Sequence, residues 1–95
     1  MKTKPLSNEY LTEVKERVDS ATPGPWISFV EGRDHFGGDS FIRVTMDDSM
    51  EDMYLQGASI ADQDFIAHAR QDIPMLLGEI ERLRQLLTSK GISYE

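Results

Sequence analysis

The first apolar pattern along the chain has helical spacing. Its positions are Leu11, Val14, Val18 and Ala21, with charged residues between them. Ser7 precedes the pattern as a typical N-cap, and the segment 22–25 (TPGP) ends it, because proline cannot continue a helix. We therefore predict a flexible tail over residues 1–6, followed by a helix.

The middle of the chain has the composition of strands. Residues 26–31 (WISFVE) and 41–46 (FIRVTM) are rich in aromatic and β-branched side chains, and residues 53–56 (MYLQ) are a shorter candidate. Residues 32–40 contain a glycine pair and form the expected loop between the first two strands. The pattern predicts a three-stranded antiparallel meander.

The last third of the chain predicts two helices. Residues 62–70 have an apolar stripe, and the segment 72–74 (DIP) interrupts it, with Asp72 as a candidate cap of a new helix that Gly91 ends. Steps of three and four alternate along this last helix, at Ile73, Leu76, Ile80, Leu83 and Leu87. Two heptads are fewer than those that indicate a coiled coil by themselves. Two interpretations stay open: a helix packed on its own sheet, or a stripe of which Leu76, Ile80, Leu83 and Leu87 form a subunit interface.

The element order α-β-β-β-α-α predicts an α+β fold in which the helices cover one face of the sheet. The chain of 95 residues is expected to form one domain over residues 7–95. A domain of this size buries only about 65% of its unfolded surface, which favours a homo-oligomer. No apolar run approaches the roughly 18 residues of a membrane span, so a cytoplasmic protein is expected.

Charge is unevenly distributed along the chain, whose net charge is -7. No Lys or Arg lies between Arg43 and Arg70, a stretch that contains Asp47, Asp48, Glu51, Asp52, Asp62 and Asp64. This acidic stretch disfavours nonspecific nucleic-acid binding, which needs a basic surface. It suits a basic protein partner, with Asp47, Asp48, Glu51 and Asp52 as the candidate interface, or it is a solvated loop that keeps the protein soluble.

Catalytic and metal-binding patterns are missing from the sequence. The chain has no cysteine, and its two histidines, His35 and His68, have no spacing that would bring them to one metal ion. Nucleophile elbows and phosphate-binding loops are also absent. We therefore predict no enzyme, no cofactor and no metal.

Several aromatic and basic side chains are candidates for a ligand site. The candidate ligand-binding residues are Trp26, Arg33, His35, Phe36 and Arg43. Aromatic rings can stack on a base, and arginine can bind phosphate through charge-assisted hydrogen bonds. The alternatives are a buried anchoring role for Trp26 and a purely conformational role for the glycine-containing loop.

Two segments together carry a family resemblance: residues 21–26 (ATPGPW) and residues 61–84 (ADQDFIAHARQDIPMLLGEIERLR). This combination resembles small phage and prophage accessory proteins, including the Ead-like proteins of lambdoid early regions. The resemblance implies a mobile-element origin and an accessory role, with no catalytic residues to carry over. The middle of the chain, residues 27–60, would then hold the specificity, as loops on a scaffold often do.

Two functions are consistent with these observations. The first is a phage-encoded, non-enzymatic binding protein that counters host defence by sequestering a small nucleotide signal in a pocket of an oligomer. The alternative is an acidic inhibitor or immunity protein that caps a basic host factor or toxin. In either case the expected location is the cytoplasm of the host cell.

Overall fold

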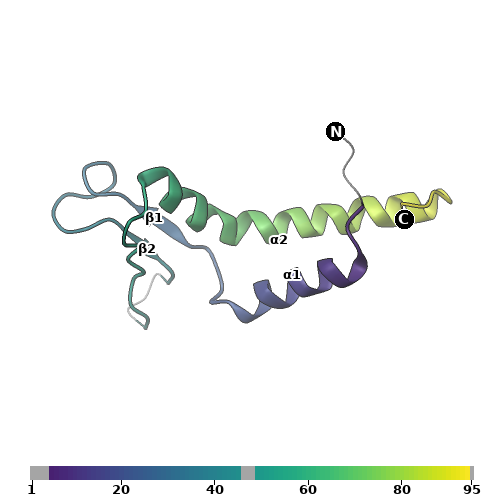
Figure 1. The fold of residues 1–95 in the computed structure, drawn as a ribbon, viewed down its shortest axis with the longest axis horizontal. Coiled ribbons are helices and arrows are strands. Elements are labelled where there is room, and N and C mark those ends of the chain that lie inside the picture. The colour runs from purple at the N-terminus through teal and green to yellow at the C-terminus, as the bar shows by residue number, and fades with distance from the viewer. Residues whose placement is uncertain (1–4, 46–48, 95) are drawn as a thin grey trace. The chain divides into compact units, whose positions relative to one another are not determined.

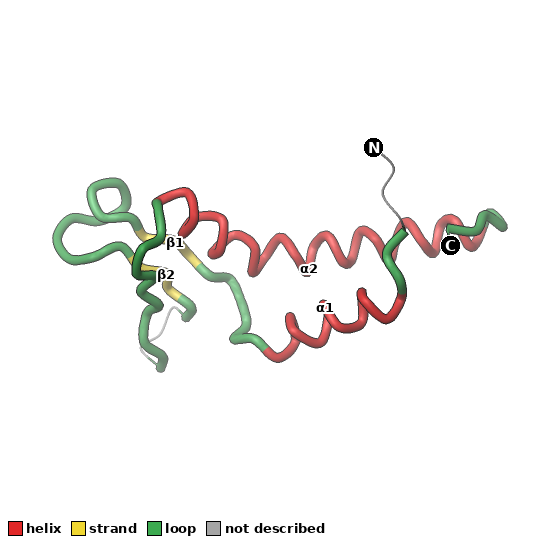
Figure 2. The backbone as a smooth tube through the Cα atoms, in the orientation of Figure 1, coloured by secondary structure: helices red, strands yellow, loops and turns green. Residues whose placement is uncertain are grey.

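The computed structural model describes residues 5–45 and 49–94 of the chain. Its elements are α1 (Asn8–Ser20), β1 (Ile27–Phe29), β2 (Phe41–Arg43) and α2 (Ile60–Ser89) (Figure 1). Figure 2 shows that loops make up most of the chain between β1 and α2. The α+β class is confirmed, but the predicted third strand and second C-terminal helix are not present in the described part of the chain.

The chain divides into two compact units. The first, which we call the sheet unit, is Thr22–Asp72 and contains both strands and the first turns of α2. The second, which we call the helical unit, joins the segment that ends at Ala21 to the segment that begins at Ile73. It therefore contains α1 and the C-terminal half of α2. Residues 1–4 of the predicted N-terminal tail lie outside the described residues.

Helix α1 begins where its sequence predicts. The Ser7 hydroxyl accepts a hydrogen bond from the backbone N–H of Tyr10 at 3.1 Å, which confirms Ser7 as the N-cap. Glu9 lies in the first turn, where a negative charge is favourable at the positive end of the helix dipole. The helix ends at Ser20, directly before the proline-containing turn.

The sheet is a single antiparallel pair. Its register places Ser28 opposite Ile42 and Phe29 opposite Phe41. The predicted third strand is wrong: Met53 makes only an isolated bridge with Ile42, through hydrogen bonds of 2.8 and 2.9 Å. Gly57, with a φ of 82° that favours glycine, then turns the chain toward α2 before further pairs can form. Met46 of the predicted second strand lies outside the described residues.

The core of the sheet unit lies between one sheet face and the first turns of α2. Ile42, Val44 and Ala67 form its buried centre, and partly buried apolar side chains pack around them. Because successive side chains of a strand point to opposite faces, Ser28 and Ile42 share the core face, and the residues on either side of them in each strand face away.

Helix α2 is continuous, so the prediction of two C-terminal helices divided at residues 72–74 is wrong. Pro74 lies inside the helix and removes one backbone hydrogen bond, at a cost of about 3 kcal/mol. The turn before it is held by Arg70 and Gln71, whose side chains bind backbone groups of Thr22 and Trp26. The turns after Pro74 are rich in leucine, glutamate and arginine, which are strong helix formers.

Both ends of α2 have recognisable capping motifs. At its start, Ser59 and Asp62 exchange backbone-to-side-chain hydrogen bonds of 3.0 and 3.1 Å, as in a capping box. At its end, Gly91 has a φ of 71° and donates to the carbonyl of Thr88, while Ile92 donates to that of Leu87. This pair of bonds is a Schellman motif, which confirms Gly91 as the stop signal.

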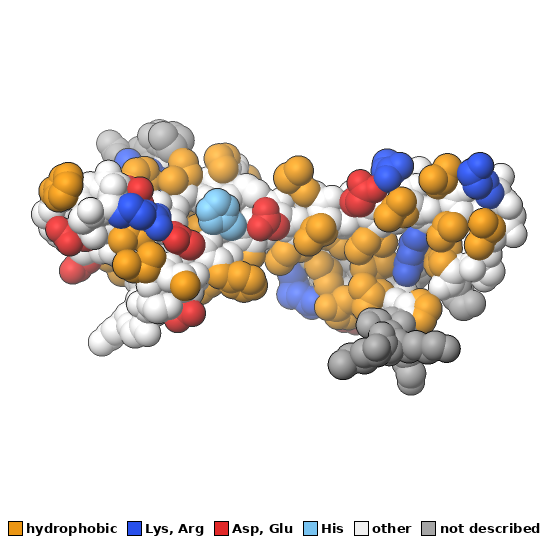
Figure 3. Space-filling view, turned by 90° about the horizontal axis from the view of Figure 1, so that it is seen from above, with side chains coloured by type: hydrophobic (Ala, Val, Ile, Leu, Met, Phe, Trp, Pro, Cys, Tyr) orange, Lys and Arg blue, Asp and Glu red, His pale blue; other side chains and the backbone are white. Residues whose placement is uncertain are grey.

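Within the helical unit, α1 lies alongside the C-terminal half of α2 (Figure 1). Arg84 of α2 connects them by donating to Asn8 Oδ1 at 2.8 Å and to the Leu6 carbonyl at 2.6 Å. A groove of about 790 Å³ runs along this unit, with Leu11 and Val18 of α1 on one side. Hydrophobic side chains gather over the unit in Figure 3. Neither described helix has the combination of length and apolar character that crossing a bilayer requires.

Candidate functional site

The sheet face opposite the core presents two aromatic rings and an arginine. Phe29 and Phe41 are cross-strand neighbours whose rings stack with centroids 5.2 Å apart and planes inclined by 19°. Arg43 follows Phe41 on the same face, because the two residues are separated by one position of the strand. Its Cζ lies 5.4 Å from the centroid of each ring. Both distances are within the range of a cation–π interaction.

Two further rings flank this arrangement. The ring centroids of His35 and Tyr54 lie 5.3 and 6.0 Å from that of Phe41, both in tilted orientations. Tyr54 is 62% exposed, so it forms the solvent edge of the group. We refer to Phe29, His35, Phe41, Arg43 and Tyr54 as the aromatic–arginine cluster, and all five belong to the sheet unit.

A tight turn positions the histidine of the cluster. Gly32, with a φ of 85°, donates its N–H to the carbonyl of His35 at 2.7 Å, and Asp34 accepts a hydrogen bond from the N–H of Val30 at 2.8 Å. His35 Nε2 is a buried side-chain nitrogen without a hydrogen-bond partner among the described residues. A buried polar atom of this kind gains free energy when a partner reaches it.

Arg43 forms an ion pair with Asp52 but stays partly exposed to solvent. Its Nε donates to Asp52 Oδ1 at 3.3 Å, and its side chain is 39% exposed. Among the described residues this is the one hydrogen bond of the Arg43 side chain, and it leaves the other guanidinium N–H groups to additional acceptors, since arginine has five donors. The cluster can therefore offer aromatic surface and a positive charge to the same ligand.

The structure brings only two of the five predicted ligand residues, His35 and Arg43, into this cluster. Trp26 instead packs against the core and donates its indole N–H to the Thr22 carbonyl at 3.1 Å. Phe36 is 86% exposed on the loop between the strands, without a ring contact to the cluster among the described residues.

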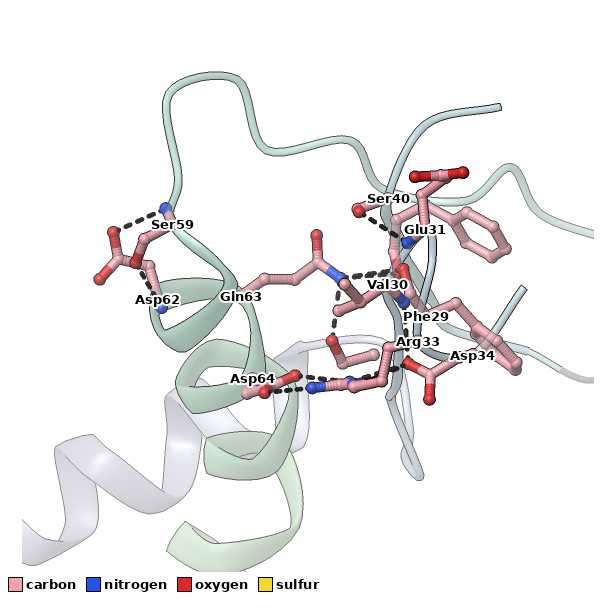
Figure 4. Close-up of polar contacts among 12 residues, drawn as sticks. Phe29, Val30, Glu31, Arg33, Asp34, Ser40, Ser59, Asp62, Gln63 and Asp64 are labelled. Carbon is pink, nitrogen blue, oxygen red and sulfur yellow. Dashed lines mark hydrogen bonds and ion pairs between the residues drawn. The ribbon is translucent and has the colours of Figure 1, made fainter. Parts of the chain in front are cut away.

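Arg33, the remaining predicted ligand residue, connects the loop to α2. It donates to both carboxylate oxygens of Asp64 at 2.8 and 3.0 Å and to Asp34 at 2.9 Å (Figure 4). The hydrogen bonds from Arg33, and then from the Ser28 hydroxyl, lower the pKa of Asp64 to about 2. Two carboxylates thus share this guanidinium, which gives Arg33 a positioning role in the sheet unit.

Gln63, which the sequence does not single out, supports the cluster from the core face of the sheet. Gln63 is only 4% exposed, and its Nε2 lies 2.9 Å from Ser28 Oγ and 3.2 Å from the carbonyl oxygens of both Phe29 and Phe41 (Figure 4). It therefore fixes the backbone of the two residues whose rings stack on the opposite face. Nothing in the sequence distinguishes Gln63 from the other glutamines, since its burial depends on where α2 meets the sheet.

The proline-containing turn is held against α2 by complementary hydrogen bonds. Gln71 accepts from the N–H of Trp26 at 2.8 Å and donates to the Trp26 carbonyl at 3.0 Å. Arg70 donates to the Thr22 carbonyl at 2.8 Å. A Cβ on Gly24 would lie 3.0 Å from Gln71 Oε1, so glycine permits this close approach. The two segments that carry the family resemblance are thus in direct contact.

The predicted acidic interface is only partly visible in the structure. Asp47 and Asp48 lie outside the described residues, and Glu51 is exposed. Asp52 binds Arg43. The nearby Asp62 and Asp64 are also bound within the chain, by the helix cap and by Arg33. Among the described residues there is no group of three or more His, Asp or Glu side chains that could hold a metal ion.

Comparisons with known proteins add no assignment. The chain matches no protein-family model, no curated protein and no solved structure. The chemistry of the aromatic–arginine cluster is therefore the evidence on which a function rests.

Proposed function

We propose that this chain is a non-catalytic binding protein whose aromatic–arginine cluster holds a small ligand with a planar ring and a negative charge, as in a nucleotide. The observation that supports this proposal is the placement of Arg43 5.4 Å from both stacked phenylalanine rings. A planar ring that stacks on an aromatic side chain gains about 1–3 kcal/mol per base. A guanidinium next to that ring can bind phosphate through short, charge-assisted hydrogen bonds.

Each member of the cluster has a distinct role in this proposal. Phe41 lies among three other rings and supplies the central stacking surface. Arg43 exchanges its 3.3 Å hydrogen bond with Asp52 for contacts with the ligand's phosphate. The phenol of Tyr54, at the exposed edge, extends the surface on which the ring stacks. His35 Nε2 is buried and has no hydrogen-bond partner among the described residues, so it supplies a further hydrogen bond when a polar group of the ligand reaches it.

The proposal is tested by calorimetric titration with mononucleotides and cyclic dinucleotides, using ribose 5-phosphate as the matched anion without a base. We expect binding of the nucleotides and at least about tenfold weaker binding of ribose 5-phosphate, because stacking is lost. Arg43→Gln should weaken nucleotide binding by about tenfold or more. Arg82→Gln, which removes an exposed arginine of the helical unit, is the matched control and should bind normally. Absence of binding at millimolar nucleotide would contradict the proposal.

The biological role rests on the resemblance to phage accessory proteins. We propose that the chain acts in the host cytoplasm as a homo-oligomer that sequesters a nucleotide signal of antiviral defence. The alternative, an acidic inhibitor of a basic protein, has less support, because Asp52, Asp62 and Asp64 already have partners within the chain. A defence that signals through a nucleotide should be suppressed by the unmodified chain and not by Arg43→Gln.

A further inference from the structure

The C-terminal half of α2 has apolar residues at the heptad spacing of a coiled coil, over about two heptads. When Ile73 is assigned to heptad position a, the core positions from Ile66 to Leu87 are all apolar. The a positions are Ile66, Ile73, Ile80 and Leu87, and the d positions are Ala69, Leu76 and Leu83. β-Branched residues at a with leucine at d are the combination that favours parallel dimers. Within the helical unit, we call Ile73, Leu76, Ile80, Leu83 and Leu87 the seam.

Three of the five seam residues are exposed in the single chain, and Ile80 and Leu87 are partly buried. Leu76 is 62% exposed, and Ile73 and Leu83 are exposed as well. All buried residues of the described chain lie in the sheet unit, so the described part of the helical unit has no buried side chain. In folded proteins, helices gain most of their stability by packing an apolar face against another element. The helical unit therefore lacks a core that a second chain would complete.

Helix α1 lies along another face of α2 and reaches the seam at Ile80, which also lines the groove between the two helices. The groove between α1 and α2 is lined on α2 mainly by positions b, e and f, such as Pro74, Leu77 and Gly78. The d residues Leu76 and Leu83 lie outside that lining. A second copy can therefore pack on the side of the seam that carries Leu76 and Leu83 without displacing α1. Pro74, at position b, does not obstruct such a contact.

The flanking charges agree with a parallel, in-register pair. Glu79 occupies position g and Arg84 occupies position e of the next heptad, the two positions that face each other across parallel helices. The partners of Arg84 within the chain are Asn8 Oδ1, the Leu6 carbonyl and the Tyr94 ring, all uncharged. Those contacts do not neutralise its positive charge. Glu79 is paired with Arg82 on the solvent side of its own helix.

We propose that this chain forms a parallel, in-register homodimer through the seam of α2. The occupant of the exposed face is a second copy of the same chain, placed so that each seam residue meets its own counterpart. Ile73, Leu76, Ile80, Leu83 and Leu87 of the two chains then form the core that the helical unit lacks. This proposal is independent of ligand binding, since the aromatic–arginine cluster belongs to the sheet unit.

Sedimentation equilibrium of the full chain tests the dimer. We expect twice the chain mass of 10.8 kDa. Leu76→Lys should weaken the dimer by about 100-fold or more, because it places a charge in the core of the interface. Met75→Lys is the matched control: Met75 is the preceding residue and is 74% exposed, but it occupies position c and should leave the dimer intact. A monomer at all concentrations, a trimer or a tetramer would overturn the proposal, as would equal effects of the two variants.

Cysteine substitution tests the orientation, since the natural chain has no cysteine. In a parallel, in-register dimer, Leu76→Cys and Leu83→Cys should each form a disulfide-linked dimer on mild oxidation, and Met75→Cys should not. An antiparallel pair can place at most one position opposite its own counterpart. Cross-linking at only one d position, or at neither while the dimer mass persists, would therefore exclude the parallel arrangement.

Discussion

Replacement of Gln63 by methionine should destabilise the fold strongly, although the two side chains have similar length and both favour helices. The amide nitrogen of Gln63 lies within hydrogen-bond distance of Ser28 Oγ and of the carbonyls of Phe29 and Phe41. An amide with two hydrogens can satisfy about two acceptors well, at about 1 kcal/mol each, and methionine leaves these groups without their donor. We expect a loss of about 2–3 kcal/mol in the free energy of unfolding.

Urea unfolding followed by circular dichroism measures this loss. The chain concentration is held constant, because the stability of a dimer depends on it. The matched control is Gln56→Met in an exposed loop, which should change stability by less than about 0.5 kcal/mol. In a chain of this length the loss for Gln63→Met corresponds to a melting temperature about 10–20 °C lower. Equal stability of the two variants would refute the claim that the hydrogen bonds of Gln63 to the two strands stabilise the sheet.

Two other predictions concern an ion pair and two glycines. Asp64→Asn should destabilise the chain at about pH 7, and its difference from the unmodified chain should shrink as the pH falls from about 4 to 2. The reason is that the pKa of Asp64 is lowered from 3.8 to about 2, so the stability contributed by its ion pair with Arg33 is lost as the carboxylate becomes protonated. Urea titrations at several pH values measure this stability difference, with Asp39→Asn at an exposed position as the control. Gly24→Ala should destabilise the chain by about 1 kcal/mol, because the added Cβ would lie too close to Gln71 Oε1. Gly78→Ala should stabilise the chain by about 0.5–1 kcal/mol, because glycine is unfavourable within a helix and the added Cβ would contact no other atom. Thermal melts in which both glycine variants shift in the same direction would contradict this pair.

Local signals predicted the start of α1 and the end of α2, and longer-range packing decided the rest of the fold. Helix α2 begins at Ile60, two residues before the predicted start at residue 62. The cap at Ser7 and the stop at Gly91 depend only on adjacent backbone groups, so the sequence predicts them well. Pro74 does not interrupt α2, because Arg70 and Gln71 hold the turn before it through contacts that the local sequence does not reveal. The third strand was reduced to one bridge at Met53, since the turn at Gly57 follows too closely.

The candidate site was predictable only where residue type alone indicates chemistry. Arg43 and His35 were identified because arginine and histidine bind ligands in many proteins. The sequence identifies Phe29 and Phe41 only as strand residues, because their pairing depends on a register that it does not specify. Gln63 was missed because its role depends on the tertiary contact of α2 with the sheet. The prediction of Arg33 as a ligand residue is not supported for the same reason, since its partner Asp64 is distant in sequence.

The central claim is that the aromatic–arginine cluster binds a nucleotide-like ligand. Nuclear magnetic resonance of the chain with ¹³C-labelled aromatic side chains tests it directly, because every ring of the cluster reports separately from Trp26 and Phe36. During titration with a nucleotide, the account predicts shifts of the Phe29, Phe41 and Tyr54 ring signals, with those of Trp26 and Phe36 unchanged. Shifts confined to rings outside the cluster, or no shift at saturating nucleotide, would contradict it.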